Sequence, residues 1–175
     1  MFRFSFGAAL LLGAFAVSAQ TSDPARRLIL AMSADETAAA ETVLGFRALG
    51  EQGQVTQKEA QCMQQVNRAA FTDVFAKTVA EQLTPEEIQK ATQFYESEVG
   101  KKFVLVQMAD AYAQFNAAPP SPAPELSEGE KQAIAVFMGS PAGAKLVNEA
   151  VLTDSPTGRK AARDRILELQ ARCRA

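Results

Sequence analysis

Residues 83–104 read LTPEEIQKATQFYESEVGKKFV, and residues 126–147 read LSEGEKQAIAVFMGSPAGAKLV. The second stretch repeats the first at an offset of 43 residues, and eight of the 22 aligned positions are identical. The shared residues are mainly of the types that cap helices, pack between helices or allow helices to approach closely. The repeat therefore predicts how the chain folds, and it does not by itself indicate a biochemical activity.

Each copy begins with the pattern of a capping box, in which a hydroxyl accepts from the third helical N–H and a glutamate reaches back to the cap. Further along, each copy contains Ser-x-x-Gly-x-Lys, where the serine caps a second helix that begins as the first one ends. The predicted corner motif comprises Thr84, Glu87, Ser97, Gly100 and Lys102 in the first copy and Ser127, Glu130, Ser140, Gly143 and Lys145 in the second. Each copy thus predicts a helix, a sharp corner and another helix, and residues 155–160 predict a third corner.

Two interpretations of the corners are open. In the one we favour, Gly100, Gly143 and Gly158 let two helices cross closely at each corner. In the other, a helix N-terminus with a glycine and a nearby lysine forms a weak anion site. A phosphate loop is excluded, because Tyr95 stands where its first glycine belongs and Lys101 is followed by a lysine instead of a hydroxyl residue.

The rest of the chain also favours helices, since helix-forming residues dominate and the period-2 alternation of strands is absent. We expect helices near residues 24–32, 35–48, 57–81, 85–95, 98–116, 128–138, 141–152 and 156–172. Residues 117–125 contain four prolines and predict a stiff connector between the two copies. The expected fold is an all-α, single-domain helical bundle built from helix-corner-helix repeats, spanning residues 20–175.

Residues 1–19 have the pattern of a cleaved signal peptide. Arg3 precedes an apolar stretch, GAALLLGAFAV, which ends in the small-x-small sequence Val17-Ser18-Ala19. A membrane anchor is the alternative, but the apolar stretch is shorter than the ~20 residues that span a bilayer. We therefore expect export to the periplasm, or secretion, of a protein that is not an integral membrane protein.

Export makes the two cysteines, Cys62 and Cys173, a predicted disulfide, because paired cysteines in an oxidising compartment are usually bridged. Both cysteines lie on apolar stripes with helical spacing, so the bridge would join the last helix to an early one. Two free buried thiols are the alternative interpretation. A redox-active pair is disfavoured, because the chain has no Cys-x-x-Cys sequence.

The composition restricts the chemistry and the partners. The chain contains no histidine, which removes the commonest general base and imidazole metal ligand. We accordingly predict no catalytic residue, no metal site and no cofactor. The net charge is −2 and no basic run occurs, so nucleic acid is not an expected partner.

Two pairs of residues would be compatible with an enzyme. Glu86 and Glu87 are a carboxylate pair, but adjacent helical residues do not jointly flank a substrate bond. Ser97 and Lys101 are spaced as a serine-lysine pair, although a serine at a helix start with a lysine one turn later is an ordinary arrangement. A carboxylate- or serine-based hydrolase acting on envelope material therefore remains the alternative to a binding protein.

The predicted helix 99–115 is apolar on two sides, which usually marks a central, buried helix. The alternative is that one stripe stays open for an apolar partner. Under that alternative, we expect a cleft where the second copy folds back past the connector. Its candidate lining comprises Met108, Tyr112, Phe115, Phe137 and Met138.

Residues 75–103, FAKTVAEQLTPEEIQKATQFYESEVGKKF, resemble the bacterial family catalogued as domain of unknown function 2059. The matching residues are Phe75, Ala76, Lys77, Thr84, Glu86, Glu87, Phe94, Tyr95, Ser97, Gly100, Lys101 and Lys102. The resemblance implies an exported, all-helical protein and no established activity. From the absence of histidine and the two-sided helix 99–115, we expect a non-catalytic periplasmic protein of the cell envelope that binds another periplasmic protein or a small apolar ligand.

Overall fold

The computed structural model describes residues 23–174. These residues form α-helices, a short 3-10 helix and one π-helical turn, and no strand occurs among them. The expected all-α fold class is therefore confirmed. The signal peptide expected for residues 1–19 lies outside the described residues.

The first two helices are separated by a single residue. Helix α1 spans Pro24–Met32, and its start is set by Pro24 in the first turn and by the Asp23 carboxylate, which accepts from the N–H of Ala25 at 3.0 Å. Ser33 ends the helix in the left-handed conformation, with φ of 50°. Helix α2 then runs over Ala34–Glu51 in a new direction.

The single helix expected over residues 57–81 is wrong, because the structure divides this segment into three elements. Helix α3 spans Gln57–Met63, the 3-10 helix η1 spans Arg68–Ala70, and helix α4 spans Thr72–Gln82. Asn67 is extended, and its side chain accepts from the N–H of Ala69 at 3.1 Å, which begins η1. The interruption lets Met63 and Phe71 enter two different apolar clusters.

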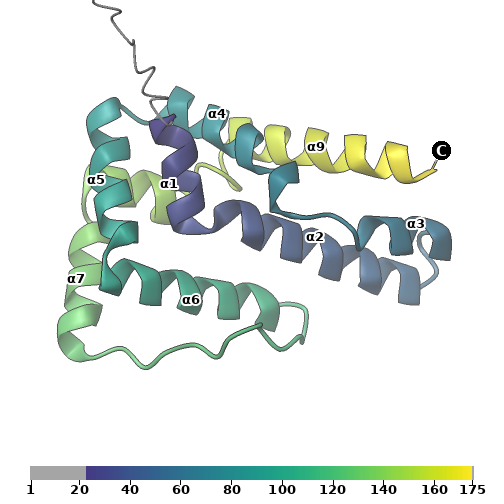
Figure 1. The fold of residues 1–175 in the computed structure, drawn as a ribbon, viewed down its shortest axis with the longest axis horizontal. Helices are drawn as coiled ribbons and strands as arrows, with labels where there is room; N and C mark the ends of the chain where they lie inside the picture. The colour runs from purple at the N-terminus through teal and green to yellow at the C-terminus, as the bar shows by residue number, and fades with distance from the viewer. Residues whose placement is uncertain (1–22, 175) are drawn as a thin grey trace, which may run out of the picture.

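Each of the two sequence copies forms a helix, a corner and the start of a second helix. Helix α5 spans Pro85–Glu96 and helix α6 spans Glu98–Ala113, with Ser97 between them. Helix α7 spans Glu128–Met138, and the short helix α8 spans Pro141–Gly143 after the cap Ser140. Residues 117–127 contain no helix and run back beneath α6 to reach α7 (Figure 1).

The helix expected over residues 141–152 is shorter than predicted. Helix α8 continues as the π-helical turn η2, Ala144–Asn148, and Ala150 then adopts a left-handed conformation with φ of 43°. Val151 and Leu152, which are adjacent in the chain, are both buried in the main core. Adjacent helical residues point about 100° apart, so leaving the helix allows both side chains to enter the core. Helix α9, Pro156–Arg174, completes the fold.

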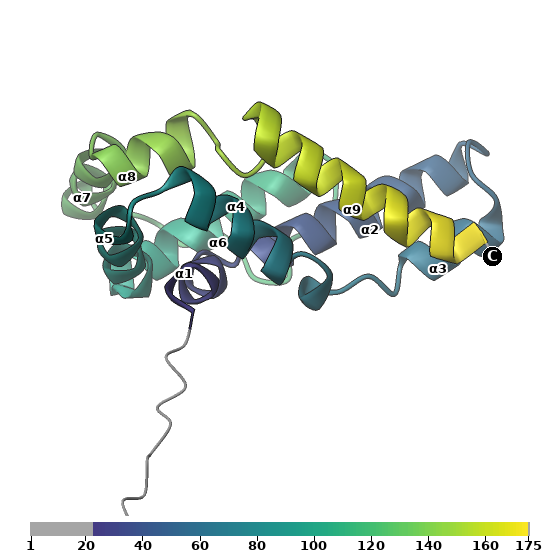
Figure 2. The ribbon, with the colours of Figure 1, turned by 90° about the horizontal axis from the view of Figure 1, so that it is seen from above.

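The helices form an elongated bundle, as two perpendicular views show (Figures 1 and 2). Helices α2 and α9 extend along its long axis, while α5 and α7 lie across one end. Helix α1 packs mainly on α4 and α5, and α9 packs on α3 and α4. The α5–α6 corner and the α7–α8 corner are therefore neighbours at one end, and the C-terminal part of α9 lies at the other.

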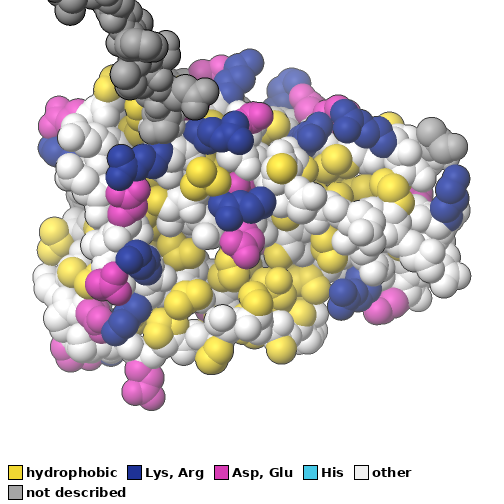
Figure 3. All heavy atoms as spheres, in the orientation of Figure 1, with side chains coloured by type: hydrophobic (Ala, Val, Ile, Leu, Met, Phe, Trp, Pro, Cys, Tyr) yellow, Lys and Arg dark blue, Asp and Glu magenta, His cyan; other side chains and the backbone are white. Residues whose placement is uncertain are grey.

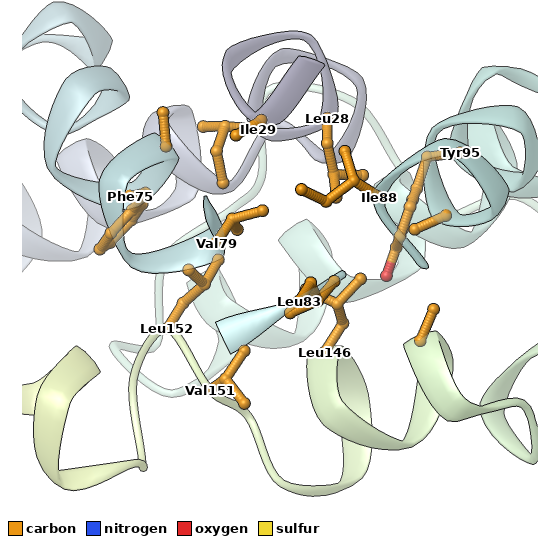
Figure 4. Packing of buried hydrophobic residues seen from close by; sticks show 14 of the residues in the cluster. Leu28, Ile29, Phe75, Val79, Leu83, Ile88, Tyr95, Leu146, Val151 and Leu152 are labelled. Carbon is orange, nitrogen blue, oxygen red and sulfur yellow. The ribbon is translucent and has the colours of Figure 1, made fainter. Parts of the chain in front are cut away.

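The main core lies among α1, α4, α5 and the α8–η2 region (Figure 4). Its largest wholly buried side chains come from three elements separated in sequence, including Leu28, Phe75 and Tyr95. Burying side chains of this size contributes about 1.5–3 kcal/mol each in transfer free energy. This cluster therefore holds both corners in position.

A second, smaller cluster lies at the opposite end and contains Phe46, Met63 and Cys173. The expected disulfide is present there: Cys62 and Cys173 are bonded at 2.01 Å and their Cα atoms are 5.6 Å apart. It joins α3 to the last turn of α9, as the apolar stripes indicated. The bridge covalently closes the end of the molecule that has the smaller core.

Candidate functional site

The serine of each corner is hydrogen-bonded to both helices that it joins. Ser97 Oγ donates to the carbonyl oxygen of Phe94 at 2.6 Å and accepts from the N–H of Gly100 at 3.1 Å. Ser140 Oγ makes the corresponding contacts with Phe137 and Gly143 at the same two distances. Each hydroxyl thus ends one helix and caps the next.

The glycine of each corner lies against the carbonyl oxygen at the end of the preceding helix. A Cβ atom placed on Gly100 would lie 2.0 Å from the carbonyl oxygen of Phe94, and one on Gly143 would lie 1.9 Å from that of Phe137. At Gly158 the corresponding distance, to the carbonyl oxygen of Val151, is 2.1 Å. These distances are far inside van der Waals contact. The geometry therefore agrees with the interpretation that glycine permits close helix crossing.

Two ion pairs join the copies through equivalent residues. Lys102 Nζ lies 2.6 Å from Glu130 Oε1, and Lys145 Nζ lies 2.9 Å from the Glu87 carboxylate. Both glutamates also close capping boxes, Glu87 with Thr84 and Glu130 with Ser127. The lysine of each corner thus binds the capping box of the other copy. Lys101 is paired with Glu98 at 2.7 Å, so the charged groups beside Gly100 are matched within the protein.

These contacts lower the pKa of both capping glutamates. The hydrogen bond from Lys102 is the largest cause at Glu130, the backbone N–H of Ser127 is the next, and together they bring its pKa to about 2. At Glu87 the pKa is lowered first by the hydrogen bond from Lys145 and then by the backbone N–H of Thr84. Both groups are consequently held as carboxylates, which is the form that accepts hydrogen bonds in a cap.

Aromatic residues of the two copies meet between the corners. The rings of Phe94 and Phe137, which occupy equivalent positions, stack with centroids 3.8 Å apart and planes 6° apart. Tyr95 meets both rings edge-on, at 5.3 Å and 5.4 Å. It is 1 % exposed and its hydroxyl has no hydrogen-bond partner among the described residues, so burial raises its pKa. Figure 4 shows this hydroxyl directed into the apolar cluster.

A groove of about 850 Å³ lies between α2 and the end of α6. One face of α2 forms its floor, with Ala40 and Val43 at the centre and Glu36 and Arg47 toward the ends. Tyr112, Phe115 and residues 116–118 form one wall, and residues 66–68 form the other. Figure 3 shows apolar side chains gathered over α2 and α6, with charged side chains at the edges. We call this the α2–α6 groove.

The five residues predicted to line one cleft are not together, and this expectation is corrected. Tyr112 and Phe115 line the α2–α6 groove, but Met108 is buried and Phe137 is stacked on Phe94. Met138 is half-buried against the main core. The prediction failed because α2, not the second copy, packs beside the last turns of α6. The ion pairs and the stacked rings hold the second copy against α5 instead.

The sequence interpretation overlooked the α2 face of this groove. Ala40, Val43 and Arg47 recur at helical spacing, which is the signal of an amphipathic face. Small residues such as Ala40 are weak evidence for exposure or burial, because both occur commonly. Only the position of α6 shows that this face is open.

Two buried carboxylates were also missed, and both serve the fold. Asp35 is wholly buried, accepts from Thr72 Oγ1 at 2.7 Å and lies 3.3 Å from the Arg68 guanidinium. Glu59 is 4 % exposed and accepts from Gln170 and Arg174 of α9. These partners lie 33 to 115 residues away in sequence, so spacing does not reveal them.

Within residues 23–174, no group of three or more acidic or cysteine side chains is arranged to hold a metal ion. None of the helices described in this range combines the length and the apolar character needed to cross a bilayer. The disulfide is compatible with an oxidising compartment.

Residues 69–117 match the model of a family described as "Uncharacterized protein conserved in bacteria (DUF2059)". The matched segment covers less than a third of the chain and runs from η1 through α4, α5 and α6, including the Ser97 corner. Searches of curated proteins and of solved structures gave no match. The resemblance expected from residues 75–103 is thereby confirmed: residues 69–117 are similar to a bacterial family that is described only as uncharacterized.

Proposed function

We propose that this protein is an exported, non-catalytic binding protein of the cell envelope whose α2–α6 groove receives a segment of a periplasmic partner protein. The observation that carries the proposal is the groove itself, which combines apolar side chains of α2, two aromatic side chains and charged and amide side chains. Interfaces are enriched in aromatic residues at their centres and are polar at their rims. The groove follows one face of α2 from Glu36 to Glu51, a length of about 22 Å at 1.5 Å per residue.

The corner residues support a binding role over a catalytic one. Ser97 uses its hydroxyl both as donor and as acceptor within the corner, and Glu87 is held by Thr84 and Lys145. A nucleophile or a general acid needs a group that is available to a substrate. Ser97 and Glu87, two residues of the hydrolase alternative, are thus engaged in the fold, whereas the groove offers surface without an internal partner.

Export is supported by the leader pattern in residues 1–19 and by the Cys62–Cys173 bridge. Structural disulfides form and persist in oxidising compartments such as the periplasm. A periplasmic partner is therefore the appropriate class for the groove.

Site-specific photo-crosslinking tests the proposal. A photoreactive residue at Phe115, which is 37 % exposed in the groove, is compared in the periplasm with one at Leu167, which is 48 % exposed on α9. We expect a discrete crosslinked protein from position 115 and none from position 167. Val43→Glu on the groove floor should abolish that product while leaving the helical circular dichroism unchanged.

Equal crosslinking from both positions, or a product that survives Val43→Glu, would contradict the proposal. If the product is specific to position 115, the crosslinking is repeated with the two purified proteins to test whether the contact is direct. Purified Tyr112→Ala protein should bind the crosslinked partner about tenfold or more weakly, as aromatic hot-spot residues do when truncated.

A further inference from the structure

A second hollow, of about 260 Å³, lies between α2, α4 and α9 on the side of α2 opposite the α2–α6 groove. The residues that α2 contributes to its lining lie on one face of the helix and include Glu41, Gly45 and Phe46. Phe71 and Phe75 contribute from the start of α4, and Ala162 and Ile166 from α9. The lining is almost wholly apolar. Its volume is below the roughly 300–1,000 Å³ of pockets that hold drug-sized ligands, so it suits a small molecule.

Glu41 is the one charged residue among those that line this pocket. Within residues 23–174, the structure gives its carboxylate no ion pair and no side-chain hydrogen bond, and desolvation raises its pKa. The adjacent residue on α2, Thr42, donates its hydroxyl to the carbonyl oxygen of Ala38 at 2.7 Å. Arg165 of α9 is engaged elsewhere, with Ala70 and Glu168. The carboxylate is thus partly desolvated without a compensating cation.

Phenylalanine rings line the same pocket as Glu41. Phe46, Phe71 and Phe75 all line the pocket, and the rings of Phe71 and Phe75 are tilted by 31° with centroids 5.8 Å apart. The face of a phenyl ring carries negative charge density and attracts a cation within about 6 Å. A carboxylate and aromatic rings around one apolar space are complementary to a cation with an apolar surface. They disfavour an anion and offer a neutral ligand no charge interaction.

We propose that the α2–α4–α9 pocket binds a small organic ammonium ion, with the Glu41 carboxylate as its counter-ion and the phenylalanine rings as its walls. Alkylammonium groups satisfy both features, because their positive charge is spread over methyl or methylene groups that pack against apolar side chains. A hydrated metal ion is disfavoured, since the lining supplies a single carboxylate where hard cations take six or more oxygen ligands. The proposal concerns the opposite face of α2 and is independent of the partner proposed for the α2–α6 groove.

The test uses choline chloride as the probe and 3,3-dimethyl-1-butanol as its neutral isostere, at matched ionic strength and near-neutral pH. Binding to the mature protein is followed by two-dimensional NMR of backbone amides. We expect saturable shifts confined to residues lining the pocket, and binding of the isostere weaker by about tenfold or more. Equal binding of the two compounds, or no saturable binding of choline, would overturn the proposal.

Two variants locate the site. Glu41→Gln removes the charge and keeps the shape, so choline binding should weaken by about tenfold or more. Glu36→Gln, on the opposite face of the same helix, should leave binding unchanged and serves as the matched control. Ala162→Met fills the pocket from α9 and should abolish binding while Glu41 is intact. Undiminished choline binding by Glu41→Gln, or equal losses in Glu41→Gln and Glu36→Gln, would refute the assignment.

Discussion

At the scale of single residues, the corners depend on a serine and a glycine three positions apart. The serine hydroxyl bridges the end of one helix and the start of the next, and the glycine removes the Cβ atom that would collide with a carbonyl oxygen. The serine's role follows from its type and position, because it is a standard cap. The glycine's role follows from the neighbouring helix, because α5 must pass within contact distance of Gly100.

Gly100→Ala should lower the free energy of unfolding by about 2–3 kcal/mol, because the new Cβ would force the α5 and α6 backbones apart. Gly129→Ala is the control: its Cβ would meet nothing within 4 Å, and the gain in helix propensity is up to about 1 kcal/mol. Equilibrium unfolding in urea measures the free energy of unfolding of both variants. Similar stabilities for the two variants would show that the corner relaxes without cost.

At the scale of elements, α6 is divided between core and surface along its length. Met108 is buried at 7 % exposure, whereas Phe115 near its end is 37 % exposed in the groove. The two apolar stripes visible in the sequence therefore have different surroundings. The periodicity alone did not distinguish them, since an apolar stripe has the same spacing whether it is covered or open.

Met108→Ala should accordingly cost about 2–5 kcal/mol of unfolding free energy, as large-to-small changes in a packed core do. Phe115→Ala should cost less than about 1 kcal/mol, because the ring is already in contact with water. Chemical denaturation of the two purified variants measures the difference. Equal costs would mean that Phe115 belongs to the core and would weaken its assignment to the groove.

The ion pairs between the capping boxes and the opposite corners predict a pH dependence. The pKa of Glu130 is lowered from 4.5 to about 2 in the folded protein, so the unfolded state binds a proton first as the pH falls. The stabilisation is therefore present above pH 4.5 and is lost as the pH falls toward 2. The melting temperature of Glu130→Gln should fall less steeply over this interval than that of the native protein.

Glu128→Gln is the matched control for this measurement, because Glu128 lies in the same first turn and is paired with the exposed Lys131. Its melting temperature should follow the native pH profile. Thermal melts monitored by circular dichroism between these pH values provide the comparison. Parallel profiles for the native protein and Glu130→Gln would refute the coupling.

At the scale of the whole molecule, the fold has a large cluster around both corners and a small one at the far end of α2 and α9. The small end also contains the disulfide and the buried Glu59, whose partners Gln170 and Arg174 both lie on α9. The attachment of α3 therefore depends on the last turn of α9. We expect this end to open before the main core does.

Reduction of Cys62–Cys173 should accelerate amide exchange in α3 and in the last turn of α9 far more than in α5. The bridge closes a loop of 111 residues, and in the chain-entropy model a loop of this length contributes about 4–5 kcal/mol. Hydrogen exchange with and without reductant measures the effect. The control is Cys62→Ser with Cys173→Ser, in which reductant should change nothing. Unaltered protection of α3 after reduction of the native protein would contradict the expectation.

Local patterns determined the helix type, the caps and both corners, because a cap or a capping box involves residues three positions apart. They also indicated the disulfide, since each cysteine lies on an apolar stripe and only one pairing is available. The break at residues 64–71 and the shortened α8 were not predictable in this way. Both depend on which apolar cluster a side chain must enter, and that is decided by helices distant in sequence.

The all-α class, the capped helix starts and the serine-glycine corners were predictable from the amino-acid sequence, because they depend on interactions within one or two helical turns. Three features became visible only in the packed structure: Lys102 and Lys145 bind the opposite capping boxes, Phe94 stacks on Phe137, and one face of α2 stays open beside α6. A groove exists only where no other part of the chain covers a surface, and which surfaces are covered depends on how helices distant in sequence pack.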